Sequence, residues 1–116
     1  MNARRLVPTP SAHTYPLLIK QLLHTPLATA LDREIVYRDR FRTTYRGLRE
    51  RIGRLASALS KLGVQQGETV AVMDWDSHRY LECYFSVPMM GAVLQTVNIR
   101  LSPAQIEYTL VDAEAS

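Results

Sequence analysis

Apolar residues recur at steps of three and four positions between residues 45 and 62, the spacing that places side chains on one face of an α-helix. This stripe consists of Tyr45, Leu48, Ile52, Leu55, Leu59 and Leu62. Thr44 precedes the stripe as a candidate N-cap, and Gly63 follows it as a candidate left-handed C′ residue. The pattern predicts one amphipathic helix with defined ends.

Two short apolar runs, residues 69–73 and 92–97, have the continuous hydrophobicity typical of strands buried on both faces of a parallel sheet. A second helical pattern lies between them. Asp76 or Ser77 can cap its start, and Pro88 kinks or ends it. Strands that alternate with helices in this way indicate parallel pairing through right-handed crossovers.

A third helix is expected directly after the second run. Ser102 and Gln105 are spaced to form a capping box, and Pro103 suits the first helical position. The buried stripe of this helix is expected to consist of Ile106, Leu110 and Ala113.

The N-terminal segment has weaker signals. Residues 1–13 lack periodicity and are expected to form an extended arm. A short helix is then predicted to start at Pro16 and to stop at Pro26. Its apolar face would comprise Leu17, Leu18, Ile19, Leu22 and Leu23.

Residues 34–38 and 42–45 are rich in β-forming side chains and predict a small hairpin, with Asp39 and Arg40 between the two strands. The fold class is therefore α/β: helices alternate with parallel buried strands after a small N-terminal β-hairpin. The length of 116 residues allows a single domain. The expected organisation is an arm at 1–13 and one αβ unit at 14–116.

Charge is distributed unevenly along the chain. Residues 1–61 carry 12 Lys and Arg against 4 Asp and Glu, whereas residues 62–116 carry 2 against 7. Seven arginines between Arg38 and Arg54 leave a nucleic-acid site open. A solvated helix face, or a surface that meets an acidic partner, is the favoured reading because no aromatic residues are interleaved for base stacking.

Cys83 is the only cysteine, which excludes an internal disulfide and favours a reducing, cytoplasmic compartment. The sequence contains no run of 18 apolar residues, so it predicts no membrane span. The first 31 residues contain no acid and include Arg4, Arg5 and Lys20, so a mitochondrial transit peptide is the alternative.

Polar side chains follow both predicted strands at their carboxyl ends, where open α/β sheets bind ligands. The carboxylates of Asp74 and Asp76 could do acid–base work or bind a cation, but ending a strand and capping a helix explain them better. Trp75 is expected to pack rather than to serve as a cofactor platform. Asn98 and Arg100 could hold an anion, although a turn-forming Asn and a surface Arg explain them equally well.

Other candidates are weaker. His13, His24 and His78 lie on separate segments, without the spacing of a metal site. Cys83 falls within an apolar helical pattern, is expected to be buried, and has no visible His partner for nucleophilic work. The five glycines are dispersed and form no phosphate-binding loop. The residues alone assign no catalytic, cofactor-binding or metal-binding residue.

Two long segments carry a family resemblance: EIVYRDRFRTTYRGLRERIGRLASALSKLGVQQGETVAV from Glu34 and YLECYFSVPMMGAVLQTVNIRLSPAQIEYTLVDAEA from Tyr80. In order and spacing they resemble the start of the AMP-forming acyl-CoA synthetases of the adenylate-forming superfamily, and within it the fatty-acid–CoA ligases. Thr44-Tyr45 before a helix and Gly91-Ala92 before a strand match two early family motifs. The resemblance covers roughly residues 14–116.

The resemblance implies an incomplete N-terminal αβ subdomain, the scaffold portion of an ATP-dependent ligase. That enzyme converts a carboxylate to an acyl-adenylate and then to a CoA thioester. ATP, Mg²⁺ and CoA are implied for the full-length enzyme. The family's phosphate loop, acidic contacts and mobile-domain lysine lie downstream, so no catalytic residue is carried over and the fragment is expected to be inactive.

The partners implied are the remainder of the synthetase and a fatty acid or other carboxylate, with self-association through exposed apolar surface. Two alternatives remain open. One is a stand-alone, non-catalytic α/β interaction module, and the less favoured one is a basic nucleic-acid-binding domain.

Overall fold

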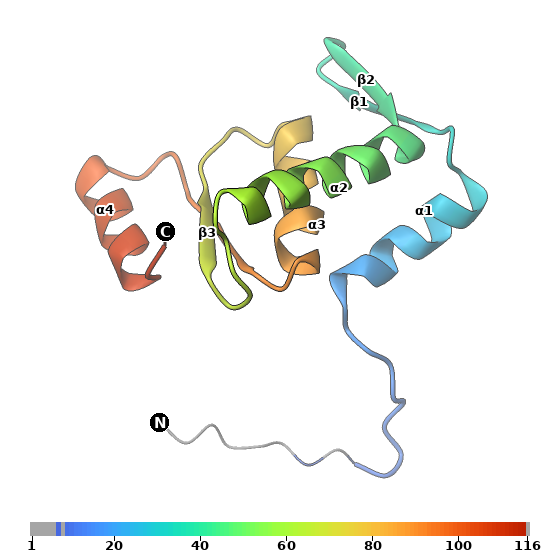
Figure 1. Ribbon diagram of the computed structural model, residues 1–116, viewed down its shortest axis with the longest axis horizontal. Helices are drawn as coiled ribbons and strands as arrows, with labels where there is room; N and C mark the ends of the chain where they lie inside the picture. Colours follow the sequence, from blue (N-terminus) through green and yellow to red (C-terminus); the bar gives the residue numbers. More distant parts are fainter. Residues whose placement is uncertain (1–6, 8, 116) are drawn as a thin grey trace.

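The computed structural model describes residues 7 and 9–115 and has a mixed α/β architecture (Figure 1). β1 and β2 form an antiparallel hairpin, and β3 and β4 form a parallel pair, which confirms the predicted fold class. In chain order the elements are the 3₁₀-helix η1 (Ile19–Leu23), α1 (His24–Thr29), β1 (Glu34–Tyr37), β2 (Phe41–Thr44), α2 (Tyr45–Lys61), β3 (Thr69–Val72), α3 (His78–Met89), β4 (Val93–Thr96) and α4 (Pro103–Asp112).

The parallel strands lie between two helical layers. Figure 1 shows α2 and α3 on one side of β3 and α4 on the other. The register pairs Thr69 with Val93 and Val72 with Thr96, so both strands end at the same edge. The loops that follow the two strands therefore start side by side.

Helix α2 has the ends that its sequence predicts. Thr44 Oγ1 accepts a hydrogen bond at 3.2 Å from the backbone N–H three residues further on, as an N-cap does. Gly63 has φ +104°, the left-handed conformation expected of a C′ glycine. Leu48 and Ile52 are buried, whereas Leu62 is 82% exposed because it is already the C-cap and projects beyond the packed face.

Helix α4 begins as predicted, with a capping box made by Ser102 and Gln105 and with Pro103 as its first residue. Its predicted apolar stripe is half-buried rather than buried, because only two strands lie beneath the helix. The same shortage of neighbours leaves β3 half-buried along its whole length. The apolar runs at residues 69–73 and 92–97 predicted strands buried on both faces, and that prediction was wrong for this chain.

An ion pair joins α2 to α3 across their packed faces. The Nε of Arg51 donates to Oε1 of Glu82, and Nη2 donates to Oε2 at 3.3 Å. Glu82 is 6% exposed, while the Arg51 side chain is 41% exposed. The hydrogen bond and the charge of Glu82 raise the pKa of Arg51, so this guanidinium stays charged.

The opening helix differs from its prediction. Residues 14–18 are not helical; the chain coils only from Ile19, and α1 continues through Pro26 to Thr29. Pro26 does not stop the helix because it lies in the first turn of α1, where a backbone N–H has no intrahelical partner to lose. Of the predicted apolar face, Leu23 is buried, and it packs in the cluster of Leu48 and Ile52.

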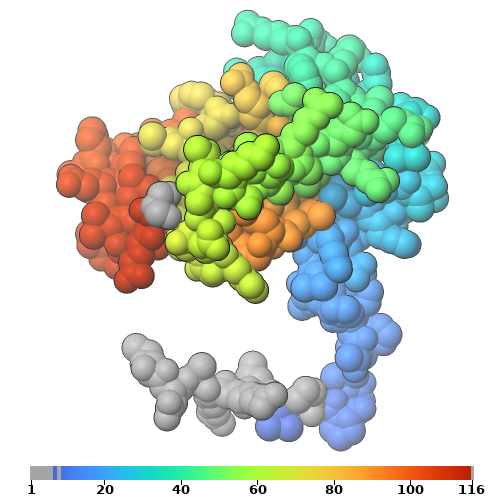
Figure 2. Space-filling view, in the orientation of Figure 1, coloured from blue at the N-terminus to red at the C-terminus, as the bar shows by residue number. Residues whose placement is uncertain are grey.

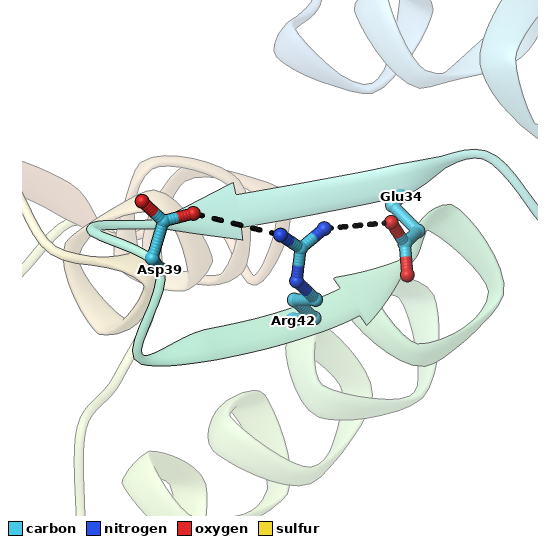
Figure 3. A network of polar contacts seen from close by, with 3 residues as sticks. All are labelled: Glu34, Asp39 and Arg42. Atoms are coloured by element: carbon cyan, nitrogen blue, oxygen red, sulfur yellow. Dashed lines mark hydrogen bonds and ion pairs between the residues drawn. The ribbon is translucent and has the colours of Figure 1, made fainter.

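The hairpin turn lies one residue earlier than predicted. Arg38 and Asp39 both have positive φ, +48° and +53°, and the Arg40 N–H donates to the Tyr37 carbonyl at 3.0 Å. These are the signs of a type I′ turn over residues 37–40, and the loop has three residues because Tyr37 pairs with Phe41. Across the strands, Arg42 contacts Glu34 at 3.0 Å and Asp39 at 3.5 Å (Figure 3).

The described part of the predicted arm stands away from the body of the molecule (Figure 2). It contains a turn in which the Ala12 N–H donates to the Thr9 carbonyl at 2.9 Å. The rest of the arm, including Arg4 and Arg5 of the transit-peptide alternative, lies outside the described residues. Within the described residues no helix is long and apolar enough to cross a membrane.

Candidate functional site

The carboxyl ends of β3 and β4 enclose a pocket of about 290 Å³. It brings together all five residues that the sequence marked as candidates at the strand ends. The pocket is lined by Asp74, Trp75, Asp76, Tyr80, Tyr84, Thr96, Val97, Asn98, Ile99 and Arg100. The edge of an open α/β sheet where strands end is the usual place for a ligand.

Two tyrosines of α3 form the side of the pocket nearest the core. The rings of Tyr80 and Tyr84 meet edge to face, with centroids 5.1 Å apart. Tyr80 is 5% exposed, burial raises the pKa of its phenol, and its hydroxyl donates to the Val72 carbonyl at 3.5 Å. Tyr84 is more open, at 41% exposed.

Asp74 is occupied by local structure. One carboxylate oxygen accepts from the Trp75 N–H at 2.8 Å, and the other accepts from the Ser77 hydroxyl. Ser77 Oγ in turn accepts from the Tyr80 N–H at 3.3 Å and caps α3. The hydrogen bond from Ser77 holds the pKa of Asp74 below its usual value. Asp74 therefore lies two residues beyond the end of β3 and braces the cap of α3, which is a structural role.

Trp75 and Arg100 meet across the mouth of the pocket. Trp75 is 57% exposed, so the expectation that it packs in the interior was wrong. The Arg100 guanidinium carbon lies 5.9 Å from the centroid of the Trp75 ring, at the outer limit of a cation–π contact. The side chain of Asn98 accepts the Arg100 N–H at 3.0 Å and shapes the turn that presents this arginine.

The pocket has groups that bind and none that would start covalent chemistry. It offers aromatic faces, one guanidinium and the carboxylate of Asp76, but no Ser, Cys or Lys paired with a base. The described residues do not fit Mg²⁺–ATP. Both oxygens of Asp74 are already engaged, and in residues 7 and 9–115 no group of three His, Cys, Asp or Glu side chains could hold a metal ion.

The remaining candidates lie elsewhere. His78 stacks on Phe41 of the hairpin, with ring centroids 3.8 Å apart, and so joins the hairpin to the start of α3. His13 stacks on Tyr15 in the N-terminal segment, 6.4 Å between centroids. Cys83 is half-buried, less than the sequence predicted, and burial raises the pKa of its thiol. None of the three adds chemistry to the pocket.

The arginine-rich region is partly neutralised by acids. Four of its arginines form ion pairs: Arg42 with Glu34 and Asp39, Arg46 with Asp32, Arg51 with Glu82, and Arg54 with Glu50. Carboxylates placed among the guanidinium groups weaken the positive potential that a phosphate backbone needs. The geometry favours a surface with mixed charge over a nucleic-acid groove.

Five lining residues were not among the candidates that the sequence offered: Tyr80 and Tyr84 of α3, and Thr96, Val97 and Ile99 at the end of β4 and just beyond it. A usable signal was present. Tyr80 and Tyr84 are four positions apart in the first turns of α3, next to the loop that follows β3. Thr96 is the last residue of β4, at the edge where the sequence had already placed the candidates.

Comparisons with known proteins agree with this architecture. Residues 21–116 match the family of AMP-binding enzymes. A long-chain-fatty-acid–CoA ligase of Thermus thermophilus is 51% identical over 73 residues, which are 63% of this chain and 14% of the relative. A 3-methylmercaptopropionyl-CoA ligase of Ruegeria lacuscaerulensis is 32% identical over 105 residues, 87% of this chain and 20% of the relative.

Solved structures give the same assignment. The anthranilate CoA ligase AuaEII, in complex with anthranoyl-AMP, superposes with a TM-score of 0.78 at 28% identity, over 87% of this chain and 20% of that one. A fatty acyl CoA synthetase of Mycobacterium tuberculosis shares the fold, with a TM-score of 0.78 at 22% identity over 85% of this chain and 20% of that one. The chain thus spans about a seventh to a fifth of the relatives' length. It belongs to the family of AMP-binding enzymes.

Proposed function

We propose that this chain is the N-terminal scaffold portion of an ATP-dependent, AMP-forming fatty-acid–CoA ligase. The observation that carries the proposal is the 51% identity, over 73 residues, with a long-chain-fatty-acid–CoA ligase. The parent enzyme would join a fatty acid to AMP with release of pyrophosphate and would then transfer the acyl group to CoA. Its proposed role is in fatty-acid metabolism.

The chain alone is proposed to be inactive. Its strand-end pocket has no nucleophile paired with a base and does not fit Mg²⁺–ATP, so ATP, Mg²⁺ and CoA would be bound mainly by other segments of the parent. The role proposed for the described residues is to form one wall of a larger binding site. Trp75 and Arg100, exposed at the pocket mouth, are the side chains best placed to face a ligand there.

The surface supports a scaffold that meets more protein. Among the described residues, fourteen large apolar side chains are exposed and only seven apolar residues are buried. A self-sufficient domain buries a larger share of its apolar surface. This observation favours the scaffold over the stand-alone interaction module.

The test of function compares two proteins. The parent protein, expressed from its complete coding sequence, should exchange pyrophosphate with ATP only when a fatty acid is present, and should then form a thioester with CoA. The 116-residue chain should do neither. Exchange by the 116-residue chain would refute the scaffold proposal, and a parent that activates only aromatic or short carboxylates would refute the fatty-acid assignment.

Two further points belong to this proposal. A cytoplasmic location is proposed from the single cysteine, and fractionation of cells expressing the tagged parent tests it against mitochondrial import. Nucleic-acid binding is expected to be absent. Retention of the chain on DNA at low salt, lost steeply as salt rises, would revive that alternative.

A further inference from the structure

Two adjoining hollows lie along η1, on a part of the surface that shares no residue with the strand-end pocket. One hollow, of about 500 Å³, lies between residues 17–20 and the end of α3 at Pro88 and Met89. The other, of about 540 Å³, lies between the η1–α1 segment and Arg49 of α2. Lys20 and Met89 line both hollows, so the two form one continuous surface, which we name the η1 surface. It lies at the end of the molecule opposite α4 (Figure 1).

The apolar part of the η1 surface is uncovered in the described chain. It consists of four side chains, whose exposed fractions are 94% for Leu17, 50% for Leu18, 67% for Leu22 and 45% for Met89. Leu18 and Leu22 are four positions apart, so they lie on one side of the coil. Leu23, on another side, is buried in the core and fixes η1 to the body of the molecule. The segment therefore presents leucines outward while it is held in place from behind.

The charge of the η1 surface is positive. Lys20 and Arg49 are both exposed, the imidazole of His24 lines the same hollow, and no Asp or Glu lines either hollow. No ion pair within residues 7 and 9–115 involves Lys20 or Arg49. The first acid of the sequence, Asp32, pairs with Arg46 instead. Both cations are therefore free to meet an anion.

Exposed apolar side chains on α4 have the opposite charge around them. Tyr108 is 69% exposed and Val111 is 72% exposed, and Glu107 and Asp112 are their neighbours along the helix. Helix α4 contains no Lys or Arg. Anionic lipid repels such a surface, which suits contact with the rest of a larger protein. The η1 surface combines similar apolar exposure with cations only.

We propose that the η1 surface docks on an anionic lipid bilayer. A bilayer supplies an apolar interior beneath a continuous layer of phosphates, so the leucines enter the acyl-chain boundary while Lys20 and Arg49 reach phosphate oxygens. This binding mode buries an apolar face about 5–10 Å deep and needs no membrane-spanning helix. A protein partner would instead need acids placed around an apolar contact. The cytoplasmic leaflet of a membrane is the negatively charged one, which agrees with the cytoplasmic location proposed for the chain.

Vesicle flotation tests the proposal with two proteins, the 116-residue chain and the parent expressed from its complete coding sequence. Vesicles of phosphatidylcholine with about a quarter of phosphatidylglycerol are compared with vesicles of phosphatidylcholine alone. Both proteins should bind the anionic vesicles about tenfold or more tightly, since each Lys or Arg near such a surface contributes about fivefold. Binding should weaken as the salt concentration rises from about 0.05 to about 0.5 M.

Matched substitutions locate the contact. Lys20→Glu should weaken binding to anionic vesicles about tenfold or more. Lys61→Glu, which changes the net charge equally at the exposed end of α2, should weaken it less than about threefold. Leu17→Ser with Leu22→Ser should weaken it about tenfold, and Val111→Ser on α4 should leave it unchanged. All these side chains are exposed, so an unchanged midpoint of urea unfolding should show that each variant folds.

A probe of depth gives a readout that does not depend on affinity. Cys83→Ser removes the native thiol, and a polarity-sensitive fluorophore is attached at Leu22→Cys. Its emission should shift to shorter wavelength on anionic vesicles and should be quenched by brominated acyl chains, because the label lies at the acyl-chain boundary. The same label at Val111→Cys should show neither change.

Four results would overturn the proposal. Equal binding to the two kinds of vesicle would show that the chain does not recognise anionic lipid. Equal effects of Lys20→Glu and Lys61→Glu would show attraction by net charge alone. Binding by the 116-residue chain but not by the parent would show that the rest of the parent covers the η1 surface. A vesicle-free dimer that Leu17→Ser with Leu22→Ser dissociates would show that a second copy covers it.

The proposal goes beyond the ligase assignment and does not depend on it. None of these readouts uses enzymatic activity. A parent that binds anionic vesicles through the η1 surface but activates no fatty acid contradicts the proposed function alone. An active ligase that ignores anionic vesicles contradicts the membrane surface alone.

Discussion

The ion pair between Arg51 and Glu82 joins α2 to α3, and its two ends are buried to different degrees. Glu82 is 6% exposed, whereas the Arg51 side chain is 41% exposed. Removing one partner of a buried pair is costly mainly because the other is left charged and unpaired away from water. The two single substitutions should therefore have unequal effects.

Arg51→Met keeps the length of the side chain but leaves the Glu82 carboxylate buried without its partner. We therefore expect a loss of about 3–4 kcal/mol in unfolding free energy. Glu82→Gln leaves Arg51 able to turn toward solvent and should cost only about 1–2 kcal/mol, close to the value of one charge-assisted hydrogen bond. The double variant should lose about 1–2 kcal/mol less than the sum of the losses in the two single variants. The reason is that, with Glu82→Gln present, Arg51→Met no longer leaves a buried charge without a partner.

Urea unfolding followed by circular dichroism at neutral pH measures these values. Arg54→Met is the matched control, because Arg54 is 78% exposed in its side chain and lies 3.8 Å from Glu50. An exposed pair of this kind contributes about 0.5 kcal/mol or less. Equal losses for Arg51→Met and Arg54→Met, or strictly additive effects of the Arg51 and Glu82 substitutions, would refute the reasoning.

Three further predictions concern single backbone and side-chain features, each measured by urea unfolding. Gly63→Ala should lower the free energy of unfolding by about 1 kcal/mol because φ is +104° there. Gly53→Ala, inside α2 with open space at the new Cβ, should raise it by about 0.5–1 kcal/mol. A shift in the same direction for both variants contradicts the assignment of Gly63 as a left-handed C′ residue. Replacing Arg38 by Asn and Asp39 by Gly should together add about 1 kcal/mol, since Asn-Gly relieves two positive-φ residues in the type I′ turn; no gain would argue against that turn in solution. The pKa of Asp74 is lowered by folding, so its contribution is complete above its unfolded pKa of about 3.9 and is lost as pH falls. Asp74→Asn should therefore reduce stability at pH 7 and weaken the loss of stability toward pH 2, and an unchanged pH profile would contradict this.

Local elements of the fold were predictable because their signals lie within a few neighbouring residues. The cap at Thr44, the left-handed Gly63 and the capping box of Ser102 and Gln105 each depend on one turn of chain, and all are present. The misplaced opening helix shows where this fails. Pro26 was taken as a stop, but the effect of a proline depends on its position in the helix, and Pro26 lies in the first turn of α1.

The candidate pocket was predicted in outline and not in detail. Two loops at the ends of parallel strands are bound to be neighbours, so the sequence could place Asp74 and Asn98 at one edge. It could not place Tyr84 in the lining or Trp75 in solvent, because an aromatic residue in an amphipathic pattern suits either a core or a pocket wall. Only the packing of α3 against β4 distinguishes a core position from a position in the pocket wall.

By itself the sequence determined the α/β class, the order of its elements and their caps, since periodicity and turn chemistry are properties of short segments. The tertiary structure alone decided how deeply those elements are buried and which side chains meet. The Arg51–Glu82 pair spans 31 residues, and the Thr69–Ala115 bridge joins the start of β3 to the end of the described chain. Such contacts depend on how whole elements pack in three dimensions, which no local pattern specifies.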